Sequence, residues 1–354
     1  MILASFLLNA RYAFNPRKPL LLARLAFALA RNVFLPARLR YVEFCIGFAC
    51  NLKCGHCFAT ALSDPSRPVM KLEEYRRVAG ECMRLGALNF SFQGGEPLLF
   101  KELKEIIAAC RPSRTVISVT TNGTLVTKER ARELKKMGVD ILTVSLDSGI
   151  AQEHDAFRGS AGAHASALQG IENALAAGLK VTLGTVVTHG TLHSPGLDAA
   201  IRFAKEKKLL LYFILPVPAG KWKDRRDMLL TEDDLSFLIA LTEQSPLLRT
   251  DFQANMGGFG CGAAKEILYL TPYGDVLACP FLHISFGNIF QDTIAAIRQC
   301  ALVQPSLSAY HPRCLASTDR AFMEHTLQRV FAADHLPLPH EQAFPNEVSE
   351  KVEP

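Results

Sequence analysis

The sequence predicts an α/β fold, a partial (β/α)6 TIM-like barrel, on three observations. Strand-like runs alternate with helix-like segments in six successive units between residues 41 and 215. The runs are mostly apolar, as expected of a parallel sheet covered by helices. Gly86, Gly138 and Gly178 each follow the end of a predicted helix, where a left-handed residue is favoured. Right-handed crossovers would wind these units into a barrel or an open part of one.

No short internal repeat or low-complexity run interrupts this alternation of strands and helices. The predicted strands are 41–48, 88–92, 115–121, 141–146, 180–187 and 210–215, and the predicted helices are 71–85, 101–110, 128–137, 164–177 and 195–207. Functional residues of such a barrel gather at the carboxyl ends of its strands. The composition, 49% hydrophobic and 21% charged, is that of a globular protein. No uninterrupted apolar run is long enough to predict a membrane-spanning helix.

Residues 1–40 differ from the rest of the chain in charge. Residues 1–42 hold seven basic and no acidic residues. Since the whole chain has a net charge of +5, the charges of the remaining residues sum to −2. No nucleic-acid surface along the chain is therefore expected. Arg17, Arg24, Arg31 and Arg38 recur every seven residues and would form one stripe on a helix, opposite an apolar face. Two interpretations are open. The helix lies in an anionic membrane interface or receives a lipid-like substrate, or it packs on the domain with its arginines solvated.

Three cysteines follow the first predicted strand directly, in the spacing Cys50-x3-Cys54-x2-Cys57. Thiolates at this spacing can converge from one loop on an iron–sulfur cubane, where three protein ligands leave one iron open. The alternative is a zinc site with His56 as its fourth ligand.

The cysteine spacing after the first strand resembles that of radical S-adenosylmethionine (radical SAM) enzymes. The second strand ends in Gln93-Gly94-Gly95-Glu96-Pro97, which matches a further motif of that family. The resemblance implies a [4Fe–4S] cluster held by the three cysteines and by S-adenosylmethionine, whose amino group the Gly94–Glu96 segment would hold. His56 departs from the family, in which an aromatic residue is more common before the third cysteine.

Further segments occur in the order expected of these enzymes. The resemblance implies that Asn122, after the third strand, lines the cofactor pocket and that Arg158 approaches the cofactor carboxylate. A solvated loop arginine is the alternative for Arg158. Ser145 and Asp147 alternate with apolar neighbours, so both face one side, where they can meet ribose or substrate.

The C-terminal part carries a second cysteine set. Tyr273-Gly274-Asp275 predicts a hairpin turn with Cys261 and Cys279 at its far ends, and Cys314 follows. The pattern resembles a reduced SPASM/twitch extension of radical SAM enzymes. It implies one auxiliary iron–sulfur cluster on Cys261, Cys279 and Cys314, with Cys300, on a predicted helix, as at best a fourth ligand. The alternative is a module that lost its cluster and keeps the thiols as small buried side chains.

These features divide the chain into a basic amphipathic segment (1–40), a radical SAM core domain (41–225), a SPASM/twitch-like module (226–331) and a flexible tail (332–354). The resemblance implies reductive cleavage of S-adenosylmethionine to a 5′-deoxyadenosyl radical, which oxidatively modifies an unactivated carbon of an unidentified substrate. That substrate is expected to be lipid-linked or membrane-associated, with a ribosomally made peptide as the rival.

The implied partner is a reducing electron donor such as flavodoxin or ferredoxin. We expect a cytoplasmic protein, either free or peripheral at the inner face of the membrane. A hypothesis of another class is a non-catalytic iron–sulfur electron carrier or a zinc-binding adaptor. Such a protein has no need of the glycine-rich and polar segments that follow the second to fourth strands.

Overall fold

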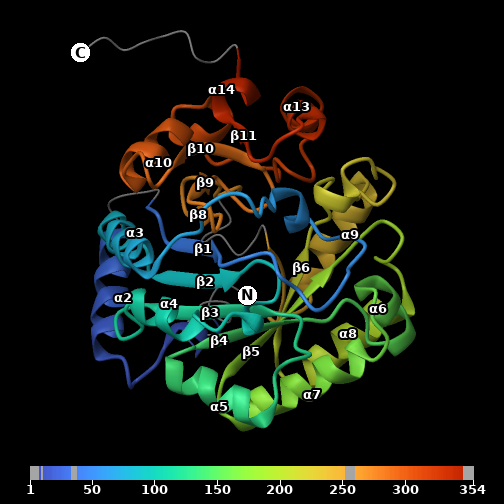
Figure 1. Ribbon diagram of the computed structural model, residues 1–354. Coiled ribbons are helices and arrows are strands. Elements are labelled where there is room, and N and C mark those ends of the chain that lie inside the picture. Colours follow the sequence, from blue (N-terminus) through green and yellow to red (C-terminus); the bar gives the residue numbers. More distant parts are fainter. Residues whose placement is uncertain (1–7, 9–10, 33–37, 252–259, 346–354) are drawn as a thin grey trace, which may run out of the picture.

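The computed structural model describes residues 8, 11–32, 38–251 and 260–345 (Figure 1). Within these residues one sheet runs through the molecule in the order β11-β10-β9-β8-β1-β2-β3-β4-β5-β6-β7. Six consecutive parallel strands form the barrel part: β1 Tyr41–Cys45, β2 Asn89–Gln93, β3 Val116–Thr121, β4 Ile141–Ser145, β5 Lys180–Val186 and β6 Leu210–Ile214. The predicted partial (β/α)6 barrel is confirmed.

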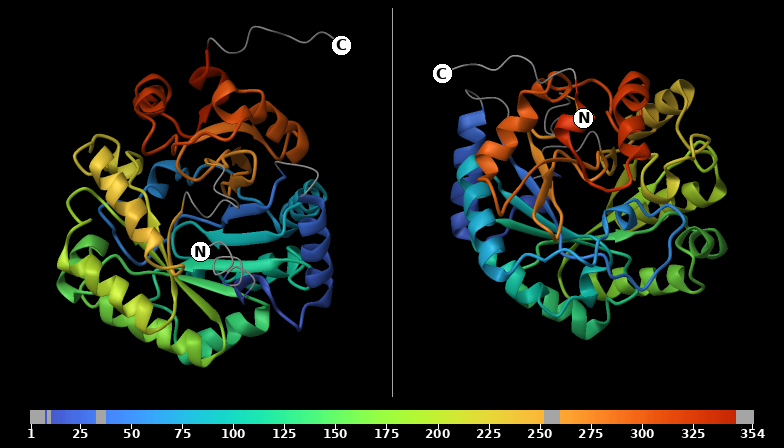
Figure 2. Two further views of the ribbon diagram at one scale, coloured as in Figure 1. Left: turned by 180° about the vertical axis from the view of Figure 1, so that it is seen from behind. Right: turned by 45° about the horizontal axis from the view of Figure 1, so that its top comes forward.

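Helices cover the convex face of this sheet and leave its concave face inside (Figures 1 and 2). They are α3 Leu72–Leu85, α4 Leu103–Ala109, α5 Lys128–Met137, α6 Ala151–Arg158, α7 Ala163–Ala176 and α8 Pro195–Glu206. Phe44 of β1 is one of the strand side chains that these helices cover. It is fully buried and its ring centroid lies 5.4 Å from that of Tyr75 in α3. Side chains alternate along a strand, so the neighbours Tyr41 and Glu43 face the concave interior.

Two local differences from the prediction concern the site. β1 ends at Cys45 rather than at residue 48, because its partner β2 ends at Gln93, whose carbonyl accepts from the Ile46 amide at 3.0 Å. α6 was not predicted; it ends at Gly159, whose φ is +62°.

The C-terminal part extends the barrel sheet beyond β1. β8 Ile267–Leu270 pairs parallel with β1, and β9 Asp275–Leu277 and β10 Ile284–Asn288 continue antiparallel. The predicted hairpin turn is confirmed, with Gly274 at φ +85° between β8 and β9. At the other edge β7 Leu248–Thr250 pairs with β6, near α9 Glu232–Glu243. The remaining elements are α10 Ile294–Leu302, α11 Pro305–Ser308, α12 Arg320–Phe322, α13 Gln328–Ala332 and the single turns η1 Ala59–Leu62, η2 Pro97–Leu99, η3 Gly220–Trp222 and η5 Met323–Leu327.

The prediction of a flexible tail from residue 332 is wrong for residues 332–345. β11 Leu338–Pro339 pairs with β10, and α14 His340–Ala343 follows it. Phe344 is buried against Phe286, at 6.2 Å between ring centroids. The Pro, His and Glu content suggested disorder, but a few apolar residues suffice to dock the segment. Residues 346–354 lie outside the described part.

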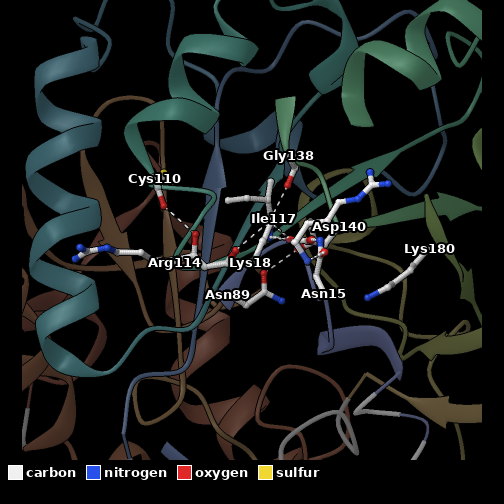
Figure 3. A network of polar contacts seen from close by, with 12 residues as sticks. Asn15, Lys18, Asn89, Cys110, Arg114, Ile117, Gly138, Asp140 and Lys180 are labelled. Atoms are coloured by element: carbon white, nitrogen blue, oxygen red, sulfur yellow. Dashed lines mark hydrogen bonds and ion pairs between the residues drawn. The ribbon is translucent and has the colours of Figure 1, made fainter. Parts of the chain in front are cut away.

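The N-terminal helix α2, Pro19–Asn32, is attached to the barrel by a buried polar network (Figure 3). The Lys18 ammonium pairs with the Asp140 carboxylate and donates to the Gly138 carbonyl at 3.0 Å. Asp140, just before β4, also accepts from Asn15 Nδ2 at 2.8 Å and from the Ile117 amide at 2.9 Å. The segment therefore sits at the amino ends of the strands.

Arg24 belongs to the predicted cationic stripe, and it is not solvated. Its guanidinium donates to the carbonyls of Arg114 and Ala87, each at 2.8 Å. The stripe therefore faces the domain in part, which supports the packed-helix interpretation. The expectation of solvated arginines is wrong for Arg24, whereas Arg17 is exposed. The side chain of Arg31 lies outside the described part. No described helix combines the length and apolar character needed to span a bilayer.

The Lys18–Asp140 pair yields a stability prediction. Replacing Lys18 by Met leaves Asp140, 2% exposed, as an uncompensated buried charge, which costs about 3–5 kcal/mol. Chemical denaturation measures the change. The exposed neighbour Arg17 provides the matched control, because Arg17→Met removes a cation from the same segment without breaking this network. A loss below about 1 kcal/mol for Lys18→Met would show that the network does not hold the segment.

Candidate functional site

The loop after β1 presents three free thiols. Cys50 is exposed, and Cys54 and Cys57 are partly buried. Burial raises the pKa of Cys54; the guanidinium of Arg158 lowers it, and the neighbouring thiols of Cys57 and Cys50 raise it further. The three thiols therefore lie near one another, at the carboxyl end of β1 where a barrel fold keeps its functional residues.

The position of this loop depends on Gly94 and Gly95 at the end of β2. The Gly95 amide donates to the Gly47 carbonyl at 2.8 Å, and the Glu96 amide donates to the Ala49 carbonyl at 2.8 Å. A Cβ on Gly95 would lie 2.1 Å from the Ala49 oxygen, and one on Gly94 would lie 2.3 Å from the Gly47 oxygen. The two glycines thus form a cradle for the backbone that leads into Cys50.

Glu96 joins the ends of β2 and β3. Its carboxylate is 1% exposed and accepts from Thr121 Oγ1 at 2.7 Å, from the Asn122 amide at 2.8 Å and from the Leu98 amide at 3.1 Å. Burial raises the pKa of Glu96, and these donors oppose the rise. A carboxylate has about four acceptor positions, so one stays open to a further donor such as an ammonium group.

Asn122 connects the third strand to the cysteine loop. Its Nδ2 donates to Asn51 Oδ1 at 2.9 Å, directly after Cys50, while its Oδ1 accepts from the Thr124 amide at 2.9 Å. The structure therefore brings Gly94, Gly95, Glu96 and Asn122 together near Cys50.

Asp147 and Arg158 bind each other. Arg158 Nε donates to Asp147 Oδ2 at 2.6 Å, and the Val186 amide donates to Asp147 Oδ1 at 3.0 Å. Burial raises the pKa of Asp147, but the Arg158 charge, the His56 ring and the hydrogen bonds from Arg158 and the Val186 amide together outweigh it and hold that pKa below its usual range. Arg158 also faces the Cys54 thiol, so it is no solvated loop residue. Ser145 ends β4 half-buried on the concave side.

His56 is held among aromatic rings. Its ring stacks on Phe157 at 4.1 Å between centroids and lies 5.6 Å from Trp222. Burial lowers the pKa of His56 to about 4, so the ring is neutral at pH 7. Its Nδ1 is buried without a hydrogen-bond partner, which leaves one polar atom of the loop open to a ligand.

A polar pair that the sequence reasoning missed lies on the concave face. Gln93 Nε2 donates to Glu43 Oε2 at 2.6 Å, and burial raises the pKa of Glu43 to about 8. A carboxyl group with that pKa can accept or give a proton near neutrality. The signal was present in β1, Tyr-Val-Glu-Phe-Cys, where a carboxylate alternates with buried apolar residues.

The C-terminal cysteines also gather. Burial raises the pKa of Cys314 well above its usual value, and Cys261, Asp251 and Cys279 raise it further, so the three thiols lie close together. Cys300 on α10 is exposed. Burial raises the pKa of its thiol, and the carboxylates of Asp292 and Glu341 raise it further, whereas none of the other three cysteines contributes. The structure therefore separates Cys300 from the trio.

The donor sets fit iron–sulfur clusters better than single ions. Among the described residues no three His, Cys, Asp or Glu side chains are arranged to hold one metal ion. Ligands of a cubane bind different irons and stand farther apart, while three free thiols on one cradled loop suit such a group. A zinc site that includes His56 gains no support, because His56 and the cysteines are not arranged around one ion among the described residues.

The glycine cradle yields a matched pair of variants. Gly95→Ala should displace the cysteine loop, because the new Cβ would overlap the Ala49 carbonyl oxygen, and iron bound after anaerobic reconstitution should fall by the share of one cluster. Gly55→Ala lies within the same loop and meets nothing within 4 Å, so it should bind iron as the parent does. Equal iron content in the two variants would contradict the cradle.

The comparisons with known proteins agree with this geometry. The family model of the Radical SAM superfamily matches residues 44–196. The Fe-coproporphyrin III synthase of Methanosarcina barkeri is 30% identical over 208 residues, which cover 58% of this chain and 52% of that protein. The mycofactocin maturase MftC of Mycobacterium ulcerans is 28% identical over 263 residues, which cover 69% of this chain and 70% of that protein. The chain thus spans about half the length of the first of these curated relatives.

The fold is also similar to solved structures. SuiB of Streptococcus suis, bound to the precursor peptide SuiA, superposes with a TM-score of 0.61 at 17% identity, over 83% of this chain and 72% of that chain. At this identity the likeness concerns the fold alone. With the matched family model and the cysteine loop at the carboxyl end of β1, residues 44–196 are a radical SAM domain.

Proposed function

We propose that this chain is a radical SAM enzyme that cleaves S-adenosylmethionine reductively and oxidises an unactivated carbon of its substrate. The observation that carries the proposal is the cradled loop with three free thiols beside buried Glu96. When bound, a [4Fe–4S] cluster and S-adenosylmethionine supply one-electron reduction and hydrogen-atom abstraction.

The chain's own residues would divide the binding of these groups. Cys50, Cys54 and Cys57 would hold the cluster, and the open acceptor position of Glu96 would take the ammonium group of the cofactor. Asn122 keeps the cysteine loop against β3. Ser145 and the Asp147–Arg158 pair would contact the ribose and the carboxylate of the cofactor.

Electron transfer requires that part of the proposed cluster be accessible to an electron donor. Cys50 is exposed, so a small electron donor such as flavodoxin or ferredoxin can approach the proposed cluster there. An electron carrier would share this feature. It would have no use for Glu96 or for the Glu43–Gln93 pair inside the barrel, which favours an enzyme.

The concave interior is where we place the substrate. Glu43, with its pKa raised to about 8, is a candidate to take up the proton that an oxidised substrate releases. A peptide is the second candidate substrate besides the lipid-linked one. The alignment with the mycofactocin maturase, over about two thirds of each chain, supports a maturase. An AdoMet-dependent heme synthase of Methanosarcina barkeri aligns over 75% of this chain and 83% of its own, so coverage alone ranks no substrate class first.

The C-terminal trio is proposed to hold one auxiliary iron–sulfur cluster in a SPASM/twitch-like module of residues 226–331. Support comes from the mutual proximity of Cys261, Cys279 and Cys314. Asp251 lies close enough to Cys261 and Cys314 for its charge to raise the pKa of both thiols.

The catalytic assignment predicts the outcome of single substitutions. Cys50→Ala, Cys54→Ala and Cys57→Ala should each abolish release of 5′-deoxyadenosine and reduce iron by about four atoms per chain. Cys300→Ala is the control, because this exposed thiol stands apart from both sets. Full cleavage activity in any of the three loop variants would contradict the assignment of these cysteines as cluster ligands.

The auxiliary cluster has an independent test. The variant lacking Cys50, Cys54 and Cys57 should still bind iron after reconstitution, and further replacement of Cys261, Cys279 and Cys314 by Ala should remove it. Thermal unfolding should show a less stable C-terminal part after the second change, since metal binding and folding are coupled. An iron-free protein after the first change would show that the trio holds no cluster.

A further inference from the structure

Lys265, in the C-terminal part, is the most deeply buried lysine among the described residues, with 2% of its surface exposed. It follows Cys261 by four residues. Lysine is almost never buried to this degree without partners, because its charged form loses hydration there. Neither the proposed cluster ligands nor the polar pair on the concave face accounts for this side chain.

The ammonium group of Lys265 has neutral partners. Its Nζ donates to the Leu307 carbonyl at 2.9 Å and to the Ala263 carbonyl at 3.2 Å. It also lies 5.6 Å from the centroid of the Tyr310 ring, within the range of a cation–π contact. Two carbonyl acceptors and a ring face favour the charged form of the amine, so Lys265 carries a positive charge into the interior of the C-terminal part.

The turn that contains Lys265 is fixed beside one of the C-terminal cysteines. The Ala264 amide donates to the Ala278 carbonyl at 3.0 Å, and Cys279 follows directly. Arg298 of α10 holds the turn from the other side, because its guanidinium donates to the carbonyls of Ala264 and Lys265 at 2.8 and 2.7 Å. The backbone that bears the lysine is therefore held in place independently of its own side chain.

Lys265 also contacts the segment that pairs with Cys261. The Leu307 carbonyl that it binds belongs to α11, and four residues later the His311 carbonyl accepts from the Cys261 amide at 2.7 Å. Burial raises the pKa of Cys261, and the charge of Lys265 is among the causes that oppose the rise. The ammonium group is thus within electrostatic reach of this thiol.

The charge of Lys265 is only partly compensated. The adjacent Glu266 carboxylate pairs with Arg40 and accepts from the Tyr310 hydroxyl, so other donors already occupy it. Burial lowers the pKa of Lys265, and the charges of Cys261 and Glu266 oppose that change. A buried cation beside the thiols therefore acts on whatever group those thiols bind.

We propose that Lys265 raises the reduction potential of the auxiliary cluster assigned to Cys261, Cys279 and Cys314, by holding a buried positive charge beside it. This inference rests on the proposed auxiliary cluster. Reduction adds one negative charge to a cluster, and a nearby cation stabilises that charge. Lys265 is a positioning residue and no ligand, because an ammonium group has no lone pair to offer iron. The cluster becomes a better electron acceptor, as an oxidation of the substrate requires.

Potentiometry of the full-length reconstituted protein, followed by electron paramagnetic resonance, tests the proposal. Lys265→Gln removes the charge but keeps N–H donors. It should shift the reduction equilibrium of the auxiliary cluster at least tenfold toward the oxidised form, a potential lower by about 59 mV for one electron. A unit charge about 10 Å away, at an effective dielectric constant of about 20, has an effect of this size. The cluster whose signal responds to S-adenosylmethionine is the internal reference and should keep its potential.

Two further variants separate charge from folding. Lys265→Arg keeps the charge and should retain the parent potential. Lys180→Gln is the matched control, because Lys180 also donates to two carbonyls, those of Tyr12 and Phe14, at the amino end of β5. It should leave both potentials unchanged.

Three results would overturn the proposal, each in a different way. An intact auxiliary cluster with the parent potential in Lys265→Gln would show that the charge has no effect on it. Loss of that cluster in both Lys265 variants would assign the lysine to folding alone. A parent protein whose only cluster signal responds to S-adenosylmethionine would refute the proposed auxiliary cluster itself, and this inference with it.

Discussion

The close backbone contact between residues 47–49 and 94–96 determines where the reactive thiols lie. Two hydrogen bonds of 2.8 Å join the segments, and only residues without a Cβ leave room for the Gly47 and Ala49 carbonyls. The buried Glu96 carboxylate extends the same connection to β3. The position of the loop, and with it that of the thiols, thus depends on one feature that a single methyl group would disrupt.

Much of this architecture could be predicted from the sequence. The six strand–helix units and the helix ends at Gly86 and Gly138 follow from local patterns, because apolar periodicity and left-handed glycines are local properties. Gly94 and Gly95 were expected, with Glu96, to hold the amino group of S-adenosylmethionine. The structure adds their close approach to the cysteine loop, a contact that depends on how two strands pair and so is not visible in either segment alone.

The predictions that changed are those that depend on tertiary contacts. Helical periodicity placed the arginines on one stripe, but it could not show that Arg24 finds unpaired carbonyls at the strand ends. The Asp147–Arg158 ion pair likewise joins two residues that were assigned separate roles. Glu43 was not predicted as a site residue. A single carboxylate in an apolar strand does not indicate a site until the structure shows which side chains, such as Gln93, lie beside it on the concave face.

The central claim is that the loop of Cys50, Cys54 and Cys57 presents a cluster with one iron open to S-adenosylmethionine. Electron paramagnetic resonance of the dithionite-reduced variant lacking Cys261, Cys279 and Cys314 isolates that cluster. The account predicts the signal of one reduced [4Fe–4S] cluster, whose shape changes when S-adenosylmethionine is added. A signal that S-adenosylmethionine leaves unchanged, or no cluster signal at all, would contradict it.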